Sequence, residues 1–121
     1  MSPTITELRT RRAQRKILLA RELDRMTGQL AGMGALRVIV FGSFAEDAVR
    51  STSDIDLIAV MPETRTGKEW RRHVGKNLDR EVGCDLLVYT EKELAEMIPV
   101  SRFLRHALAT GRTVYEKRPE T

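Results

Sequence analysis

Two closely spaced aspartates, Asp54 and Asp56, are the residues of this sequence best suited to chemistry. They stand directly before an apolar run at 57–61 that predicts a β-strand. Residues two apart point to the same face of a strand, so we expect the two carboxylates to lie side by side. Neighbouring carboxylates repel each other when both are ionised, and Mg²⁺ removes this repulsion because it binds oxygen ligands. The pair therefore predicts a magnesium site.

Gly42 and Ser43 form a candidate phosphate-binding turn upstream of the aspartates. They follow another apolar run, at 38–41, and ten residues separate Ser43 from Asp54. Glycine allows a ligand to approach the backbone closely. A helix that begins here would direct N–H groups, together with the serine hydroxyl, at a phosphate. We therefore expect a unit of strand, tight turn, short helix and strand that supplies both phosphate donors and a metal site.

The order of these residues resembles the signature of the DNA polymerase beta-type nucleotidyltransferase superfamily. Gly42-Ser43, ten intervening residues and Asp54-Ile55-Asp56, with an apolar strand on each side, match that signature. Because the chain is short, it resembles the minimal nucleotidyltransferases, which are often paired with a HEPN-domain partner in bacterial and archaeal toxin–antitoxin modules. The resemblance covers most of the chain, from about residue 36 to residue 116.

Two acidic residues depart from the pattern of this family. The family usually continues as Gly-Ser-x-Ala-Arg-Gly, but here Glu46 stands at the arginine position and Asp47 at the glycine position. A carboxylate repels the negative charges of a triphosphate, whereas an arginine attracts them. The departure therefore favours weaker triphosphate binding than is usual in the family.

Asp85 is the candidate for a third carboxylate. It is the only charged residue in the predicted strand 84–89, and it precedes an apolar run, as Asp56 does. In the superfamily a third carboxylate lies on a strand next to the Asp-x-Asp strand. The resemblance therefore implies that Asp85 joins Asp54 and Asp56 around two Mg²⁺ ions and takes the proton from the acceptor hydroxyl. The alternative is an aspartate at a strand end that pairs with an arginine.

The resemblance implies a Mg²⁺-dependent enzyme that transfers AMP from ATP to a protein. Gly42 and Ser43 would bind the triphosphate, and the acceptor would be a tyrosine of a separate HEPN toxin, which makes the protein an antitoxin. Two alternatives stay open. One is a non-catalytic binding module that neutralises its partner by occlusion, which Glu46 and Asp47 favour. The other is a nucleotidyltransferase for a small molecule or RNA that works as a homodimer.

Length and composition indicate one globular domain, residues 1–121. The chain has 41% hydrophobic and 31% charged residues, a formal net charge of +4 and a pI near 9.6. A basic surface fits an anionic partner, but 5% aromatic residues do not favour a surface that stacks single-stranded bases. A single cysteine excludes an intrachain disulfide. No apolar run has the length of a membrane span or a signal-peptide core, so we expect a cytoplasmic protein.

A long N-terminal helix is expected over about residues 4–33. Apolar residues recur at spacings of four and three and form one stripe: Leu19, Leu23, Met26, Leu30 and Met33. This stripe predicts packing on the sheet, and the alternative is a contact with a second chain.

Upstream on the same helix lies a basic run: Arg9, Arg11, Arg12, Arg15 and Lys16. Such a run is most often a solvated helix end. The functional alternative is a contact with RNA phosphates or with an acidic partner surface.

The remaining pattern predicts an α+β fold with a small mixed sheet of about four strands, flanked by helices, between about residues 36 and 117. Thr90 and Glu93 have the spacing of a capping box at the start of one helix. Besides the elements already named, helices are expected over 68–81, 90–97 and 101–110, a last strand over 112–117, and a frayed tail over 118–121.

Overall fold

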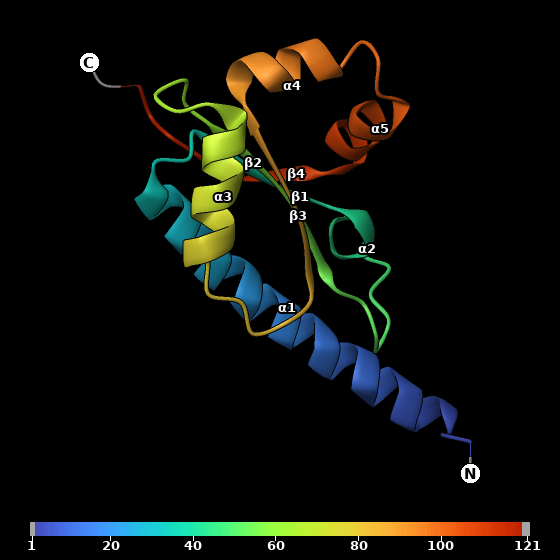
Figure 1. The fold of residues 1–121 in the computed structure, drawn as a ribbon. Helices are drawn as coiled ribbons and strands as arrows, with labels where there is room; N and C mark the ends of the chain where they lie inside the picture. Colours follow the sequence, from blue (N-terminus) through green and yellow to red (C-terminus); the bar gives the residue numbers. More distant parts are fainter. Residues whose placement is uncertain (1, 120–121) are drawn as a thin grey trace.

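A computed structural model describes residues 2–119 and has a four-stranded sheet with helices on both faces (Figure 1). In chain order the elements are α1 (Ile5–Met33), β1 (Arg37–Phe41), α2 (Gly42–Ala45), β2 (Ile55–Met61), α3 (Gly67–Asn77), β3 (Cys84–Thr90), α4 (Glu91–Met97), α5 (Arg102–Thr110) and β4 (Arg112–Glu116). The strand order is β3-β2-β1-β4. β1 is antiparallel to both neighbours, and β2 and β3 are parallel. The predicted mixed sheet and α+β fold are confirmed.

Alternation along the strands divides the core into two parts. In β1, Val38 and Val40 pack with α1 and α3, whereas Ile39 and Phe41 pack with α4 and α5. The helix α3 connects the parallel strands β2 and β3, because parallel neighbours need a crossover connection. Since Asp56 lies between two residues of the α1 side, its side chain belongs to the face that α4 and α5 cover.

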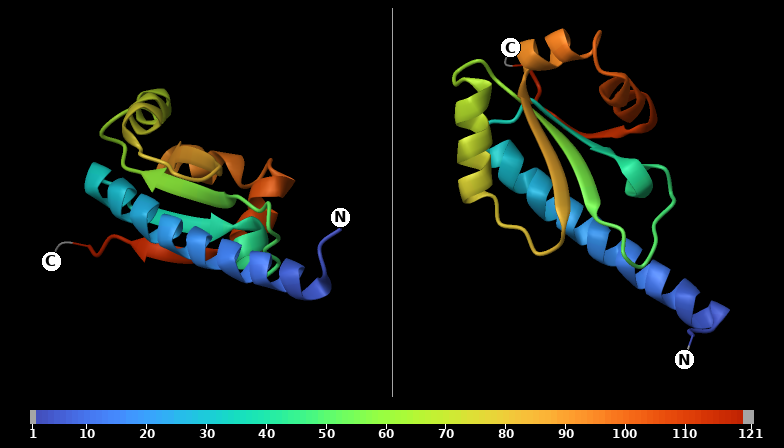
Figure 2. Two further views of the ribbon diagram at one scale, coloured as in Figure 1. Left: turned by 90° about the horizontal axis from the view of Figure 1, so that it is seen from below. Right: turned by 45° about the vertical axis from the view of Figure 1, so that its right-hand side comes forward.

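The helix α1 follows its predicted bounds closely and packs only part of its length on the sheet. The stripe residues Leu19, Leu23, Met26 and Leu30 are buried, as predicted. Thr4 caps the helix by accepting a hydrogen bond from the amide of Glu7, 3.1 Å away. The N-terminal half extends beyond the sheet (Figures 1 and 2) and leaves hydrophobic side chains such as Ile5, Ile17 and Leu18 exposed.

The capping box at Thr90 is confirmed. The Thr90 hydroxyl accepts a hydrogen bond from the Glu93 amide at 3.2 Å, and the Glu93 carboxylate accepts one from the Thr90 amide at 3.0 Å. This reciprocal pair ends β3 and begins α4 within one residue.

The helix predicted over 68–81 is shorter in the structure, because α3 ends at Asn77. Beyond it, the amide of Asp79 donates to the Gln29 side chain at 2.7 Å, and the amide of Glu81 donates to the Glu22 carboxylate at 2.8 Å. These amides bond to side chains of α1 rather than to carbonyls of a continuing helix. Tertiary contacts therefore end the helix earlier than its own pattern predicts.

Glu22 is the centre of this connection between α1 and the loop before β3. Its side chain is 3% exposed and accepts hydrogen bonds from Arg25, with Nε at 3.1 Å from Oε2. Burial by itself raises the pKa of Glu22, but hydrogen bonds from Arg25 and the Glu81 amide outweigh it and hold the pKa below 4.5. Arg25 also pairs with Asp79 at 3.2 Å. The network fixes the segment that leads into the strand of Asp85.

Two further expectations concern the C-terminal tail and membrane-spanning helices. Residues 117–119 have no regular secondary structure, and Glu120 and Thr121, the rest of the tail predicted to be frayed, lie outside the described residues. Among the described helices, none combines the length and the apolar composition that crossing a membrane requires.

We predict that Glu22→Gln lowers the free energy of unfolding by about 1–3 kcal/mol at pH 7, because it removes a buried charged acceptor. The folded pKa of Glu22 is depressed, so its contribution is present above pH 4.5 and is lost as the pH falls through the folded value. Urea unfolding of both proteins at pH 7 and below pH 4 measures this. The exposed neighbour Asp24 supplies the control, Asp24→Asn. A difference that stays constant over this pH range would contradict the assignment.

Candidate active site

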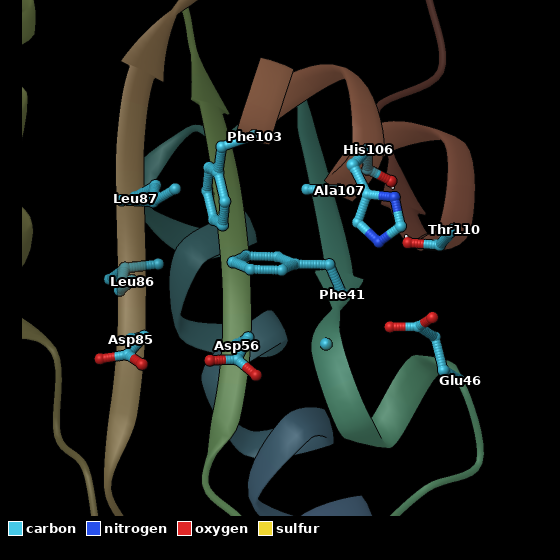
Figure 3. Close-up of a pocket in the computed structure, with 11 residues that line it drawn as sticks. Phe41, Glu46, Asp56, Asp85, Leu86, Leu87, Phe103, His106, Ala107 and Thr110 are labelled. Carbon is cyan, nitrogen blue, oxygen red and sulfur yellow. Dashed lines mark hydrogen bonds between the residues drawn. The ribbon is translucent and has the colours of Figure 1, made fainter. Parts of the chain in front are cut away.

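Asp56 and Asp85 are direct neighbours on the parallel strands β2 and β3. They are register partners, and their carboxylates lie at the same end of a cavity (Figure 3). Asp56 is half-buried and Asp85 is exposed. The expectation that Asp85 lies on the strand next to that of Asp56 is confirmed.

The environment of Asp56 is unfavourable for a negative charge. Burial raises the pKa of Asp56 to about 6, and the negative charge of Asp85, a hydrogen bond with Asp85 and the charge of Asp54 contribute in the same direction. A divalent cation between these oxygens would favour the ionised form and remove the repulsion. The donor set at this position therefore fits Mg²⁺.

Gly42 brings the turn after β1 directly against the Asp56 carboxylate. Its φ of 70° lies in the left-handed region, and a Cβ atom at this position would collide with the carboxylate oxygen of Asp56. Both the conformation and the close approach require glycine here. Gly42 lines the cavity, whereas Ser43, in the single turn of α2, does not. The phosphate-binding roles of Gly42 and Ser43 stay predictions.

Asp54 differs from the sequence-based expectation because it precedes β2 rather than lying in it. Strand alternation therefore does not set the direction of its side chain. Its Oδ1 atom lies 3.2 Å from a guanidinium nitrogen of Arg15. Within residues 2–119, no three Asp, Glu, His or Cys side chains form a ready metal cluster. The structure thus brings together two of the three predicted ligands and holds the third on Arg15.

The cavity beside Asp56 and Asp85 has a volume of about 510 Å³ and a mixed lining. Its apolar part includes Phe41 and Phe103, whose ring centroids are 5.7 Å apart in an edge-to-face arrangement. Glu46 lies on the other side of the cavity from the two aspartates, near α5 (Figure 3). The space is large enough for a nucleoside or an aromatic side chain.

The helix α5 supplies cavity residues that the sequence analysis does not identify. They follow one helical face at spacings of three, four and seven: Phe103, His106, Ala107 and Thr110. This spacing is visible in the sequence and predicts a common face. The sequence contains no signal that places this face against the end of β1, which depends on the packing of Leu104 and Ala107 on the sheet.

The two residues that depart from the family pattern have different positions. Asp47 has a φ of 53°, a conformation that glycine adopts most readily, so this position would also accommodate the glycine that is usual in the family. Its carboxylate lies 2.7 Å from Lys16 Nζ, and this hydrogen bond lowers the pKa of Asp47. Glu46 lines the cavity, and no Lys or Arg of the described chain does so.

The fold and this site define a nucleotidyltransferase domain. A family model described as "Polymerase beta, Nucleotidyltransferase" matches residues 34–120 of the chain, and the protein belongs to this family. A solved structure from Sulfolobus solfataricus, which carries the provisional description of a nucleotidyltransferase, matches with a TM-score of 0.64 and 16% identity over 88% of each chain. At this identity the match supports the fold. A search among curated proteins finds no significant match.

We predict that Asp56→Asn stabilises the metal-free protein by about 1 kcal/mol at pH 7.5, because it removes a charge that partial burial and the neighbouring Asp85 both disfavour. The folded pKa of Asp56 is raised from 3.8 to about 6, so wild-type stability decreases as the pH rises through this window. The advantage of the variant should disappear near pH 4. Thermal unfolding in EDTA measures both values, with Asp24→Asn as the surface control. Equal melting temperatures for wild type and Asp56→Asn at pH 7.5 would contradict the prediction.

Proposed function

We propose that this protein is a Mg²⁺-dependent nucleotidyltransferase that transfers AMP from ATP to a tyrosine of a separate HEPN-type toxin and thereby acts as an antitoxin. The observation that carries the proposal is the register pair Asp56 and Asp85 beside the Gly42 turn. Membership in the nucleotidyltransferase family supports the type of reaction. The protein acceptor and the toxin partner rest on the resemblance to minimal nucleotidyltransferases.

The proposed mechanism assigns a role to each carboxylate. Asp56, together with Asp54 when its carboxylate is available, would hold the Mg²⁺ that carries the triphosphate, and Asp85 would join them in holding a second Mg²⁺ on the acceptor side. Bound Mg²⁺ would neutralise the negative charge that develops when the acceptor hydroxyl attacks the α-phosphorus of ATP and pyrophosphate leaves. Asp85 is the more exposed of the two register partners, so it can reach the acceptor hydroxyl and take its proton. Gly42 and the neighbouring amides bind the triphosphate.

The lining of the cavity suits an aromatic acceptor. Phe41 and Phe103 present ring surfaces next to the two aspartates (Figure 3). Aromatic rings pack favourably in edge-to-face and offset geometries. The proposal places the acceptor tyrosine ring against these two side chains, in the cavity that Asp56 and Asp85 also line. The acceptor side chain would enter from the open side, where Phe103 is 57% exposed.

The N-terminal half of α1 is the proposed docking surface for the toxin. It projects beyond the sheet (Figure 2) and combines exposed Ile5, Ile17 and Leu18 with exposed Arg11 and Arg12. Exposed hydrophobic side chains on a basic helix fit a partner surface that is apolar at its centre and acidic at its rim. Docking here would leave the cavity near α5 free for the acceptor segment.

A non-catalytic antitoxin that neutralises its partner by occlusion is the second candidate. Glu46 favours it, because this carboxylate lines the cavity at a position where the family usually has arginine. The cavity is lined by three carboxylates and, within the described residues, by no Lys or Arg. Without bound cations this negative charge weakens the binding of a triphosphate. The two candidates differ in whether any acceptor gains the mass of AMP.

We predict that the protein, incubated with a HEPN-type protein and Mg-ATP, adds one or more AMP units to that partner, as read by intact mass spectrometry. Asp85→Asn should keep most nucleotide affinity and lose at least about 100-fold in rate, because Asp85 acts in the transition state. Glu81→Gln, which changes an exposed carboxylate in the loop four residues before Asp85, is the control.

The outcomes separate the candidates. An unmodified partner that is still bound and inhibited supports occlusion and contradicts transfer. Label on RNA or on a small molecule instead of the partner would move the protein to another acceptor class. Labelling by Asp85→Asn at the wild-type rate would remove Asp85 from the mechanism.

We further predict that Glu46→Arg tightens Mg-ATP binding by about three- to tenfold, because it replaces a repelling charge in the cavity with an attracting one. Glu46→Gln removes only the repulsion and should give a smaller gain. The increase in melting temperature on titration with Mg-ATP measures the affinities, since a ligand that binds the native state stabilises it. Unchanged affinity in both variants would show that Glu46 does not face the bound nucleotide.

A further inference from the structure

Arg15 connects the basic run of α1 to the segment that carries Asp54. Its Nε atom donates to the carbonyl oxygen of Ser53 at 2.7 Å, and one terminal nitrogen lies 3.2 Å from Asp54 Oδ1. The Arg15 side chain is 22% exposed, less than any other cation in an ion pair of the described chain. The guanidinium group thus binds a carbonyl and a carboxylate of successive residues directly before β2.

The next residue on the helix provides an internal comparison. Lys16 pairs with Asp47 at 2.7 Å, but its side chain is 55% exposed and that of Asp47 is 81% exposed. A solvated pair of this kind contributes little to stability. Arg15 differs because it bonds at two points, is more buried, and has as its partner a residue of the Asp-x-Asp motif.

Arg15 and a metal ion would compete for the same carboxylate. The charge of Asp54 acts on Asp56, so the two carboxylates are electrostatic neighbours. A guanidinium group on Asp54 neutralises part of the negative charge that attracts a divalent cation. It also occupies one carboxylate oxygen of Asp54.

We infer that Arg15 is a positioning residue that controls the metal affinity of the site through Asp54. In the metal-free protein the guanidinium group holds Asp54, and Asp54 completes the ligand set only when this ion pair opens. One residue of the basic run, Arg15, therefore acts on the metal site, whereas the other residues of the run are exposed. The inference rests on the proposed function, because it takes Asp54 as a metal ligand.

The test is a titration with Mn²⁺, followed by the electron paramagnetic resonance signal of the free ion. Arg15→Ala and Arg15→Gln both remove the guanidinium charge, and Gln retains a donor for the Ser53 carbonyl. Both variants should bind Mn²⁺ about three- to tenfold more tightly than wild type, because Asp54 is released. Lys16→Ala, which removes the neighbouring pair with Asp47, should bind as wild type does. Far-UV circular dichroism verifies that each variant is folded.

A double variant identifies the route of the effect. In Arg15→Gln combined with Asp54→Asn, the gain in affinity should vanish, because the freed carboxylate is absent. Unchanged or weaker Mn²⁺ binding in both Arg15 variants would overturn the inference while leaving the proposed function intact. A gain that persists in the double variant would also overturn it. If neither wild type nor any variant binds Mn²⁺, both the inference and the proposed function fail.

Discussion

The half-buried carboxylate of Asp56 next to a second carboxylate, Asp85, is the constraint that the rest of the site must accommodate. Asp56 and Asp85 are register partners on parallel strands. Burial, followed by the nearby Asp85 and Asp54, raises the pKa of Asp56 to about 6. Burying a carboxylate beside a like charge destabilises a fold, so the surrounding contacts must offset it. The two strands are held in this register by their parallel pairing at one edge of the sheet and by the α3 crossover. The unfavourable pair is what makes the position suitable for a cation.

The helix α1 maintains this arrangement from the other face of the sheet. Through Arg15 it binds the segment before β2, and through Glu22 and Gln29 it binds the segment before β3. One helix therefore positions the segments that lead into both aspartate-bearing strands. The buried leucine and methionine residues of α1 pack on the sheet and fix the position of the helix. The backbone positions from which its polar side chains extend are therefore fixed as well. The long helix is thus a support for the site as well as a covering for the core.

The cavity combines family features with a charge pattern of its own. The glycine turn and the aspartate pair lie within the part of the chain that matches the nucleotidyltransferase family. Glu46 adds a third carboxylate to the lining, while Asp47 has a positive φ and pairs with Lys16. The turn after β1 therefore keeps a backbone conformation that suits glycine at position 47, whereas Glu46 makes its electrostatic potential more negative than an arginine would. Such a site depends more strongly on bound cations than one with a lining arginine.

Local rules let the sequence by itself determine most of the elements, and the motif spacing together with the family resemblance names the candidate carboxylates. Apolar runs predict the strands, the leucine stripe predicts the packing of α1, and the spacing of Thr90 and Glu93 predicts a cap, because each of these depends on residues a few positions apart. Only the tertiary structure decided where α3 ends, which partner holds Asp54, and which face of α5 lines the cavity. The deciding hydrogen bonds span 39 residues from Arg15 to Asp54, 50 from Gln29 to Asp79 and 59 from Glu22 to Glu81. Contacts at such separations leave no periodic signal in the chain, so they emerge only when the core has brought the segments together.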